Sequence, residues 1–375
     1  MLRRAPRRCH ALILGEGEPV YSGSTPRQDE VMVHRRNARK LSLDTPVRRD
    51  GRGRRAGTPV NIPFKGWRDV VLRVYHAFND NNLSIIAAGV SFYGMLAIFP
   101  GVAAFVSVYG LIQDPANVVD QMEALSGVVP PDVVSTVTGQ MTQVAARPEA
   151  SLGFAALFTL ALALWSARKG TTALMIALNV VYAERETRNF FVKIAVSLAL
   201  TLAIVLGLSA VALLAAGVPL LLAGLGFGDW IVAVGRGVGL GAAALLLMIG
   251  IAGLYRYAPS RRPPKWRWVM VGAAVVTVFW ILGSLAFSVY VAFSDSYSAT
   301  YGSLGAVVVV LTWLYITVLI MLVGGELNAQ LEFQTARDTT TAGDRPMGQR
   351  GAFVADNIAQ RAEEIDFEKN KTGPG

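Results

Sequence analysis

The sequence is poor in the residues that catalytic and metal sites require. Its 375 residues include one cysteine, Cys9, and three histidines, His10, His34 and His76. A single cysteine excludes an intramolecular disulfide and a cysteine-based metal cluster, and no histidine has the spacing of a zinc site. The Gly-x-x-x-x-Gly-Lys motif of a phosphate-binding loop is also missing, which argues against nucleotide-driven transport by this chain alone. We therefore expect no metal, no other cofactor and no enzymatic activity.

Charged residues are scarce as well. They make up 16% of the chain, and 53% is hydrophobic, whereas soluble domains carry about 25% charged residues. The net charge of +9 lies wholly in residues 1–65, with 15 Lys and Arg against 6 Asp and Glu, because residues 66–375 hold 20 of each. We expect this basic tail to be disordered and cytoplasmic. It would contact anionic lipid headgroups, or serve only as a topology determinant; no nucleic-acid partner is expected.

Six segments are long and apolar enough to cross a bilayer, which takes about 20 residues each. They are 84–112, 152–181, 192–223, 231–255, 267–293 and 301–327. Every second loop between these segments is rich in Lys and Arg, and positively charged loops stay on the cytoplasmic side. The sequence therefore predicts an all-α, polytopic membrane protein, a bundle of six transmembrane helices with both termini cytoplasmic.

The same patterns divide the chain into three parts. Residues 1–65 and 333–375 are predicted to be cytoplasmic tails, the second of them mostly disordered. Between them lies a membrane domain, 66–332, with an external loop at 113–150 that we expect to be helical. Residues 66–80 have one apolar stripe at helical spacing, typical of an interfacial helix or of a cap packed on the bundle. The glycines of "GRGVGLG" at 235–241 are expected to allow close helix packing.

Polar residues inside the apolar segments are the candidate cavity or transport residues, because such residues are costly in a membrane. Arg168 is predicted either at the cytoplasmic interface or facing a cavity together with Asn179. Glu326 is predicted either inside the bundle, paired with a cation such as Arg168, or where the last helix emerges. Asn328 lies close to Glu326 in sequence, and Glu332 is expected to be solvated.

Two further groups complete the candidates. The first apolar segment carries Ser91, Tyr93 and Pro100. Proline removes a helical hydrogen bond, at about 3 kcal/mol in a helix interior, so we expect a helix break or packing kink at Pro100. Tyr301 lies in a hydroxyl-rich external turn that either caps a helix or coordinates a solute.

Five stretches in order resemble the YihY/BrkB family of bacterial inner-membrane proteins: "AAGVSFYGMLAIFPG", "WSARKGTTALMIALNVVY", "YRYAPSRRPP", "YGSLGAVVVVLTWLY" and "GGELNAQLE". The resemblance covers roughly residues 65–335. Phe92 replaces the more common second tyrosine, and Gly325 replaces an alanine. The resemblance implies a six-helix protein of the bacterial inner membrane. An older label for the family is ribonuclease BN, but this chain lacks the His and Asp cluster of a metal-dependent nuclease.

Two functions remain open from the sequence. The first is transport or permeation of an unidentified solute or lipid, indicated by the polar residues in the spans and by the proline in the first of them. The second is a non-transporting envelope protein that organises lipids or partner proteins. The lipid bilayer is the expected partner in both cases, and the sequence leaves a homo-oligomer open.

Overall fold

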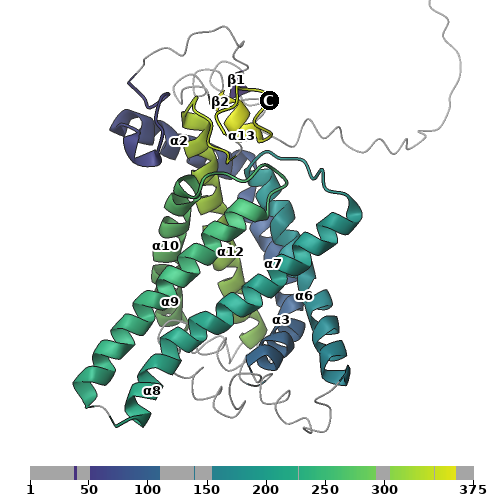
Figure 1. Cartoon of the computed structure of the whole chain (residues 1–375), viewed down its shortest axis with the longest axis vertical. Coiled ribbons are helices and arrows are strands. Elements are labelled where there is room, and N and C mark those ends of the chain that lie inside the picture. The colour runs from purple at the N-terminus through teal and green to yellow at the C-terminus, as the bar shows by residue number, and fades with distance from the viewer. Residues whose placement is uncertain are drawn as a thin grey trace, which may run out of the picture. The chain divides into compact units, whose positions relative to one another are not determined.

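The structure is a computed structural model, and the residues it describes are 38–39, 51–109, 139, 154–226, 228–292, 305–341 and 343–359. All of them lie in one of two compact units of the chain, Met32–Gly375. This described part is mostly helical (Figure 1), as predicted. Its strands, β1 (Ala38–Arg39) and β2 (Ile358–Ala359), pair antiparallel and have two residues each.

Long helices lie in the segments that were predicted to be apolar spans. They are α3 (Leu83–Tyr109), α6 (Phe154–Val181), α7 (Phe190–Ala212), α9 (Asp229–Tyr257), α10 (Trp266–Ala292) and α12 (Gly305–Gln334). Among the described residues, four helical runs are long and apolar enough to cross a membrane, those of α7 with its continuation, α9, α10 and α12. A fifth is added if α3 and the helix before it form one bent span. Four or five spans are thus supported, and the sixth stays a prediction.

α12 is the central helix of the described part, because it packs against α10, α3, α6 and α2 (Phe64–Asp80) (Figure 1). Its buried Leu322 belongs to one apolar core together with side chains from α3, α6, α9 and α10. Gly324 allows the closest approach: a Cβ there would collide with the Val276 side chain and would lie 2.9 Å from the Tyr255 hydroxyl. The core therefore depends on small residues at helix crossings, as is usual in membranes.

The helix that starts with α7 continues past a proline. α7 leads through a π-helical turn, η3 (Leu213–Gly217), into α8 (Val218–Gly224), which has Pro219 in its first turn. A π turn takes up the register change that proline imposes, because proline cannot donate its backbone hydrogen bond. α9 packs against this run through Gly235 and Gly239, where a Cβ would collide with Leu222 and with the Leu214 carbonyl. The predicted packing role of these two glycines is confirmed.

The break at the start of the membrane domain is not at Pro100. α3 is helical from Leu83 to Tyr109, through the proline. The predicted interruption there is wrong, because one lost hydrogen bond does not outweigh the helical bonds that an apolar surrounding demands of the rest of the backbone. The chain bends instead between α2 and α3, by 65°. Asn82, at the bend, has a φ of 50°, a left-handed conformation that asparagine tolerates.

Parts of the chain within both predicted tails, 1–65 and 333–375, pack against the helices. Ala56 and Ile62 are buried in a second core cluster with Val70 of α2 and Trp268 of α10. After α12, Arg350 is 5% exposed and donates to three backbone carbonyls, those of Arg345, Ala355 and Ala336. The physical reason is that charged side chains satisfy backbone groups here, which a hydropathy pattern does not reveal.

Candidate functional site

The last turns of α12 carry a run of buried polar side chains. Glu326, Asn328, Gln330, Glu332 and Gln334 are all between 0 and 3% exposed. With 3.6 residues per turn, the first, third and fifth of them lie on one face of the helix, and the second and fourth lie on the opposite face. Both faces must therefore be covered by other parts of the chain, and the structure shows different partners on each.

The first face meets α2 through Arg73. The Gln330 amide donates to Glu326 (2.8 Å), and the Arg73 guanidinium donates to the side-chain oxygens of Gln330 (2.8 Å) and Gln334 (2.6 Å). The Gln334 amide donates to the Arg52 carbonyl (2.6 Å), and Arg52 forms an ion pair with Asp69 (2.8 Å). A continuous chain of polar contacts thus runs from the buried Glu326 carboxylate to the segment before α2.

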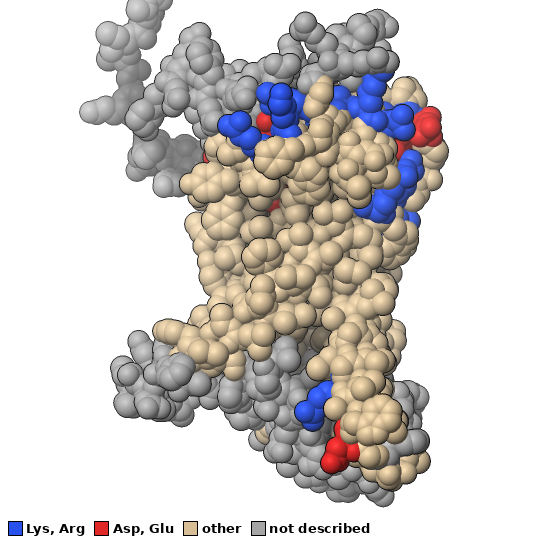
Figure 2. All heavy atoms as spheres, turned by 90° about the vertical axis from the view of Figure 1, so that its left-hand side faces the viewer, with Lys and Arg blue, Asp and Glu red and all other residues tan. Residues whose placement is uncertain are grey.

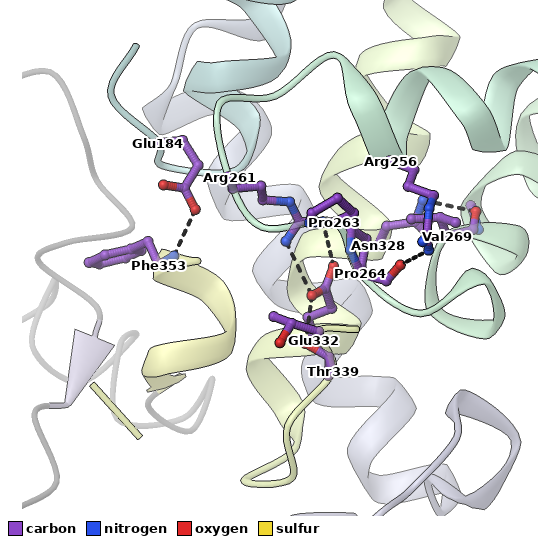
Figure 3. Close-up of polar contacts among 12 residues, drawn as sticks. Glu184, Arg256, Arg261, Pro263, Pro264, Val269, Asn328, Glu332, Thr339 and Phe353 are labelled. Carbon is purple, nitrogen blue, oxygen red and sulfur yellow. Dashed lines mark hydrogen bonds and ion pairs between the residues drawn. The ribbon is translucent and has the colours of Figure 1, made fainter. Parts of the chain in front are cut away.

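The second face meets α10 through Asn328. Its side-chain oxygen accepts from the Gly272 amide (2.8 Å), and its nitrogen donates to the Val269 carbonyl (3.1 Å) (Figure 3). Both partners are backbone groups inside a helix, so Asn328 ties α12 to α10 at a fixed register. Asn328 thus makes a packing contact between the two helices.

Glu332 forms a buried ion pair with Arg261 from the loop between α9 and α10 (Figure 3). The two side chains are 2.8 Å apart and 0% exposed, and the Thr339 hydroxyl donates to the same carboxylate (2.8 Å). The expectation that Glu332 is solvated is wrong, because the α9–α10 loop and the segment after α12 supply a cation and a hydroxyl there. Burial alone would lower the pKa of Arg261, but the Glu332 carboxylate raises that pKa above its usual value.

The Arg261 guanidinium also lies 4.0 Å from the ring centre of Tyr182, just after α6. Burial raises the pKa of the Tyr182 phenol above its usual range. The neighbouring Asn179 accepts from the Ser260 amide (2.7 Å) and donates to Glu186 (3.2 Å). Asn179 therefore fastens the end of α6 to the α9–α10 loop.

The candidates in the first long helix do not join this network. Ser91 is 1% exposed and donates to the Ala87 carbonyl one turn earlier (2.7 Å). Tyr93 is 47% exposed and lies edge-on to Phe92. The Pro100 side chain and all of Tyr301 lie outside the described residues, as does the predicted helical loop 113–150 apart from Gly139.

Arg168 does not pair with Glu326. Its guanidinium lies 4.1 Å from the ring centre of Trp165 on the same helix, whereas Glu326 is hydrogen-bonded to Gln330. Arg168 is half-buried and Lys169 is exposed. The alternatives that joined Arg168 to Asn179 or to Glu326 are not seen among the described residues, because each of the three has a different neighbour.

Sequence reasoning missed the partners that bury the end of α12: Arg73, Arg261, Gln330, Gln334 and Thr339. One signal was present, since Gln330 and Gln334 follow Glu326 at intervals of four residues and so share its helix face. The arginines carried no such signal.

Charged side chains lie mainly at the ends of the helices. Figure 2 shows most of the Lys and Arg on this face at one end, where the α9–α10 loop lies. Below it is a belt almost free of charged side chains, and a smaller group of basic and acidic side chains lies at the opposite end. Within the described ranges, no group of three or more His, Cys, Asp and Glu is arranged to hold a metal ion.

Comparison with known proteins agrees with this architecture. A family model described as virulence factor BrkB matches residues 74–347. YfkH of Bacillus subtilis (strain 168), named as ribonuclease-like, is 30% identical over 253 residues, 65% of this chain and 88% of the relative. A UPF0761 membrane protein of Delftia acidovorans is 27% identical over 71% of this chain and 62% of the relative, so the match spans less than two thirds of that protein. No solved structure matches. The chain is a membrane protein that belongs to the virulence factor BrkB family.

Proposed function

We propose that this chain is a multi-pass transport or permeation protein of the bacterial inner membrane, acting on an unidentified solute or lipid. The observation that carries the proposal is the Glu326 carboxylate, which is 0% exposed within the α12 candidate span. A carboxylate inside a membrane helix is costly and marks a functional site by default. Its contacts lead through Gln330 and Arg73 toward the charged end of the bundle.

The proposal includes a topology of six crossings with both termini in the cytoplasm. The charge distribution supports it: the α9–α10 loop carries Arg256, Arg261, Arg262, Lys265 and Arg267, and positive loops stay inside. In this arrangement α2 lies at the cytoplasmic surface of the membrane. The tail before it would meet anionic headgroups there.

Cysteine labelling tests the topology, because Cys9→Ser leaves a chain without cysteine. Leu225→Cys would report on the turn before α9, and Asp344→Cys on the segment after α12; the side chains are 73% and 97% exposed. A membrane-impermeant maleimide applied to spheroplasts should label the first, and should label the second only after permeabilisation. The opposite labelling pattern would show that the chain has the reverse orientation in the membrane.

Reconstitution tests the transport function. Purified protein in liposomes is assayed with labelled organic anions, organic cations, sugars and fluorescent lipids, with protein-free liposomes as the baseline. We expect movement of one class, its loss in Glu326→Gln, and unchanged movement in Asp344→Asn, which removes an exposed carboxylate at the same end. Movement of no class above the baseline would count against transport.

The alternative is a non-transporting envelope protein that organises lipids or partners. The fixed contacts of Asn179 and Asn328 favour it, because both side chains are engaged by backbone groups. Residues 1–37 can be deleted without touching β1, which pairs with β2, or the packed segment that begins at Arg52. If this deletion abolishes the cellular phenotype while Glu326→Gln retains it, the alternative is supported.

A nuclease is the least supported function. The relative YfkH is named as ribonuclease-like, so RNA cleavage is worth one direct assay. Metal-dependent cleavage by the purified chain, absent from a mock purification, would overturn our expectation of no enzymatic activity.

A further inference from the structure

Arg168 and Lys169 lie halfway along the helix bundle. Gly325 is the last residue of α12 before the charged Glu326, and a Cβ at Gly325 would lie 3.3 Å from Val181 and 3.4 Å from Leu178 of α6. Arg168 is 10 to 13 residues from these contacts, which at 1.5 Å per residue is roughly 15 to 20 Å. The hydrocarbon core of a bilayer is about 30 Å thick, so on the predicted span α6 the pair lies within the core, deeper than Glu326.

A second set of contacts gives the same depth. Next to the pair, Gly170 packs against α3, where a Cβ would lie 3.2 Å from Ala97 and 3.6 Å from Gly94. Gly94 in turn faces Leu314 of α12. Leu314 is well inside residues 306–325, which carry no charge and as a helix measure about 30 Å. The two cations therefore sit at a level where α12 is apolar.

Among described residues, neither cation has an ionic partner. Lys169 is exposed on the side of α6 away from the buried Ala167, between Leu162 and Ile176, which are 52% and 51% exposed. The Nε of Arg168 is buried without a hydrogen-bond partner. Its charged group has one neighbour of note, the Trp165 ring at 4.1 Å.

A cation at the centre of a membrane helix costs about 2.5 to 3.5 kcal/mol on insertion scales. The chain offsets such a cost elsewhere, since Arg261 has Glu332. At mid-depth the described residues offer a tryptophan face and no carboxylate, and an anion from outside the chain would supply the counter-charge that they lack. A guanidinium presents its donors in a planar fork that fits phosphate oxygens, and an adjacent ammonium adds a second charge.

We propose that Arg168 and Lys169 bind the phosphate group of a solute or lipid as it passes the middle of the membrane. This inference rests on the proposed function, for which it names the substrate class. The phosphate can belong to an anionic lipid headgroup or to a water-soluble compound, and the two sources are separated by experiment.

Binding is measured apart from movement, on the purified full-length chain. Calorimetry with inorganic phosphate tests the soluble source, and native mass spectrometry of protein exchanged into phosphatidylglycerol or phosphatidylcholine tests the lipid source. We expect one source to bind, with phosphatidylglycerol retained over phosphatidylcholine in the lipid case. In Arg168→Gln/Lys169→Gln the Kd should rise at least about tenfold, a loss of about 1.4 kcal/mol.

Two variants make the test specific. Arg236→Gln removes an exposed cation from α9 and should leave the Kd unchanged, whereas Lys169→Arg keeps the charge and should bind nearly as the unaltered chain. Size-exclusion chromatography and thermal unfolding show whether the double variant is folded, and Lys169→Gln, at an exposed position, gives a second measurement if it is not.

The outcomes separate this inference from transport itself. No binding of either source, or a Kd within twofold of the unaltered chain in the folded double variant, overturns the site. If the protein moves neutral or cationic solutes and the double substitution does not change that movement, the phosphate site is overturned but the transport function is retained. Phosphate binding that depends on the pair, without movement of any solute or lipid, upholds the site and overturns transport.

Discussion

Arg261 and Arg168 show how one residue type serves two different regions of the same helical protein. Each guanidinium lies about 4 Å from an aromatic ring, Tyr182 at 4.0 Å and Trp165 at 4.1 Å. Arg261, at the charged end of the bundle, has a carboxylate partner in Glu332 and a fully buried side chain. Arg168, at mid-depth, has no such partner among the described residues. Arg261, which has a counter-charge, holds the fold, whereas Arg168, which has none among the described residues, is the arginine that we propose binds a ligand.

The largest effect should come from breaking the ion pair at the charged end. In Arg261→Met the Glu332 carboxylate stays buried without its cation, and we expect a loss of about 3 to 5 kcal/mol in stability. Thermal unfolding of the purified protein in detergent measures it. The double variant Arg261→Met/Glu332→Leu should recover most of the loss, because neither charge remains. If Arg261→Met alone is as stable as the unaltered chain, Arg261 does not hold the fold, and the difference between Arg261 and Arg168 is contradicted.

A smaller loss is expected where α10 crosses α12 at the same end. In Gly272→Ala the new methyl group would meet the Gly324 carbonyl and lie 2.6 Å from the Asn328 side chain. Such overpacking costs about 1 to 3 kcal/mol. The matched control is Gly253→Ala on α9, where nothing lies within 4 Å, and alanine should be neutral or stabilise the helix by up to about 1 kcal/mol. Equal unfolding temperatures for both variants would show that the crossing is not tightly packed.

The sequence predicted the apolar helices well and the charged end poorly, for a physical reason. Hydropathy and helical period are local, so α9, α10 and α12 followed from composition alone. Arg73 and Gln330 are 257 residues apart in sequence, and no local pattern links them. Glu332 was expected in solvent because it follows the last apolar residues, yet Arg261 and Thr339 enclose it.

The candidate site was predicted as a set of residue types, and only part of its geometry followed. Glu326 is buried inside the bundle, which was one of its two predicted positions, and Asn328 is buried as well. The two side chains lie on opposite faces of α12 and contact different partners. A helix break at Pro100 was predicted because proline is disfavoured in helices. The interruption at Asn81–Asn82 followed from the predicted limits of the helix 66–80 and of the span from 84, but its 65° bend did not. Polar residues in a span can thus be found from sequence, but their partners cannot.

A pH effect should be confined to the charged end. Burial would raise the pKa of Asp338, but hydrogen bonds from the backbone of Arg345 (3.0 Å) and from Thr340 (2.8 Å) lower it below the usual 3.8. This stabilisation is full above the unfolded pKa and is lost as the pH falls through the folded one, so it begins to decline below about pH 3.8.

Hydrogen exchange of the backbone amides in residues 343–351, corrected for the intrinsic effect of pH, would measure the stabilisation that the ionised Asp338 gives to this segment. We expect protection to fall in that acidic range, and to be low already at neutral pH in Asp338→Asn. Each hydrogen bond to a charged group contributes about 1.5 to 3 kcal/mol. Because the bonds to Asp338 hold only this local segment, the global unfolding temperature should change less than in Gly272→Ala. Protection that is constant from neutral pH to pH 2.5 would contradict the assignment.

The smallest effect is expected at mid-depth, and it sharpens the comparison most directly. Lys169→Gln removes an exposed cation that has no ionic partner among the described residues. Unfolding in detergent keeps this side chain in the same apolar surrounding, so the insertion cost of the cation largely cancels and stability should stay within about 0.5 kcal/mol of the unaltered chain. Any change should be a gain, because the charge is unfavourable in hydrocarbon. The same unfolding assay as for Arg261→Met gives the answer. If Lys169→Gln instead loses several kcal/mol, then Lys169 is held by a counter-charge within the protein, and the two regions follow the same rule.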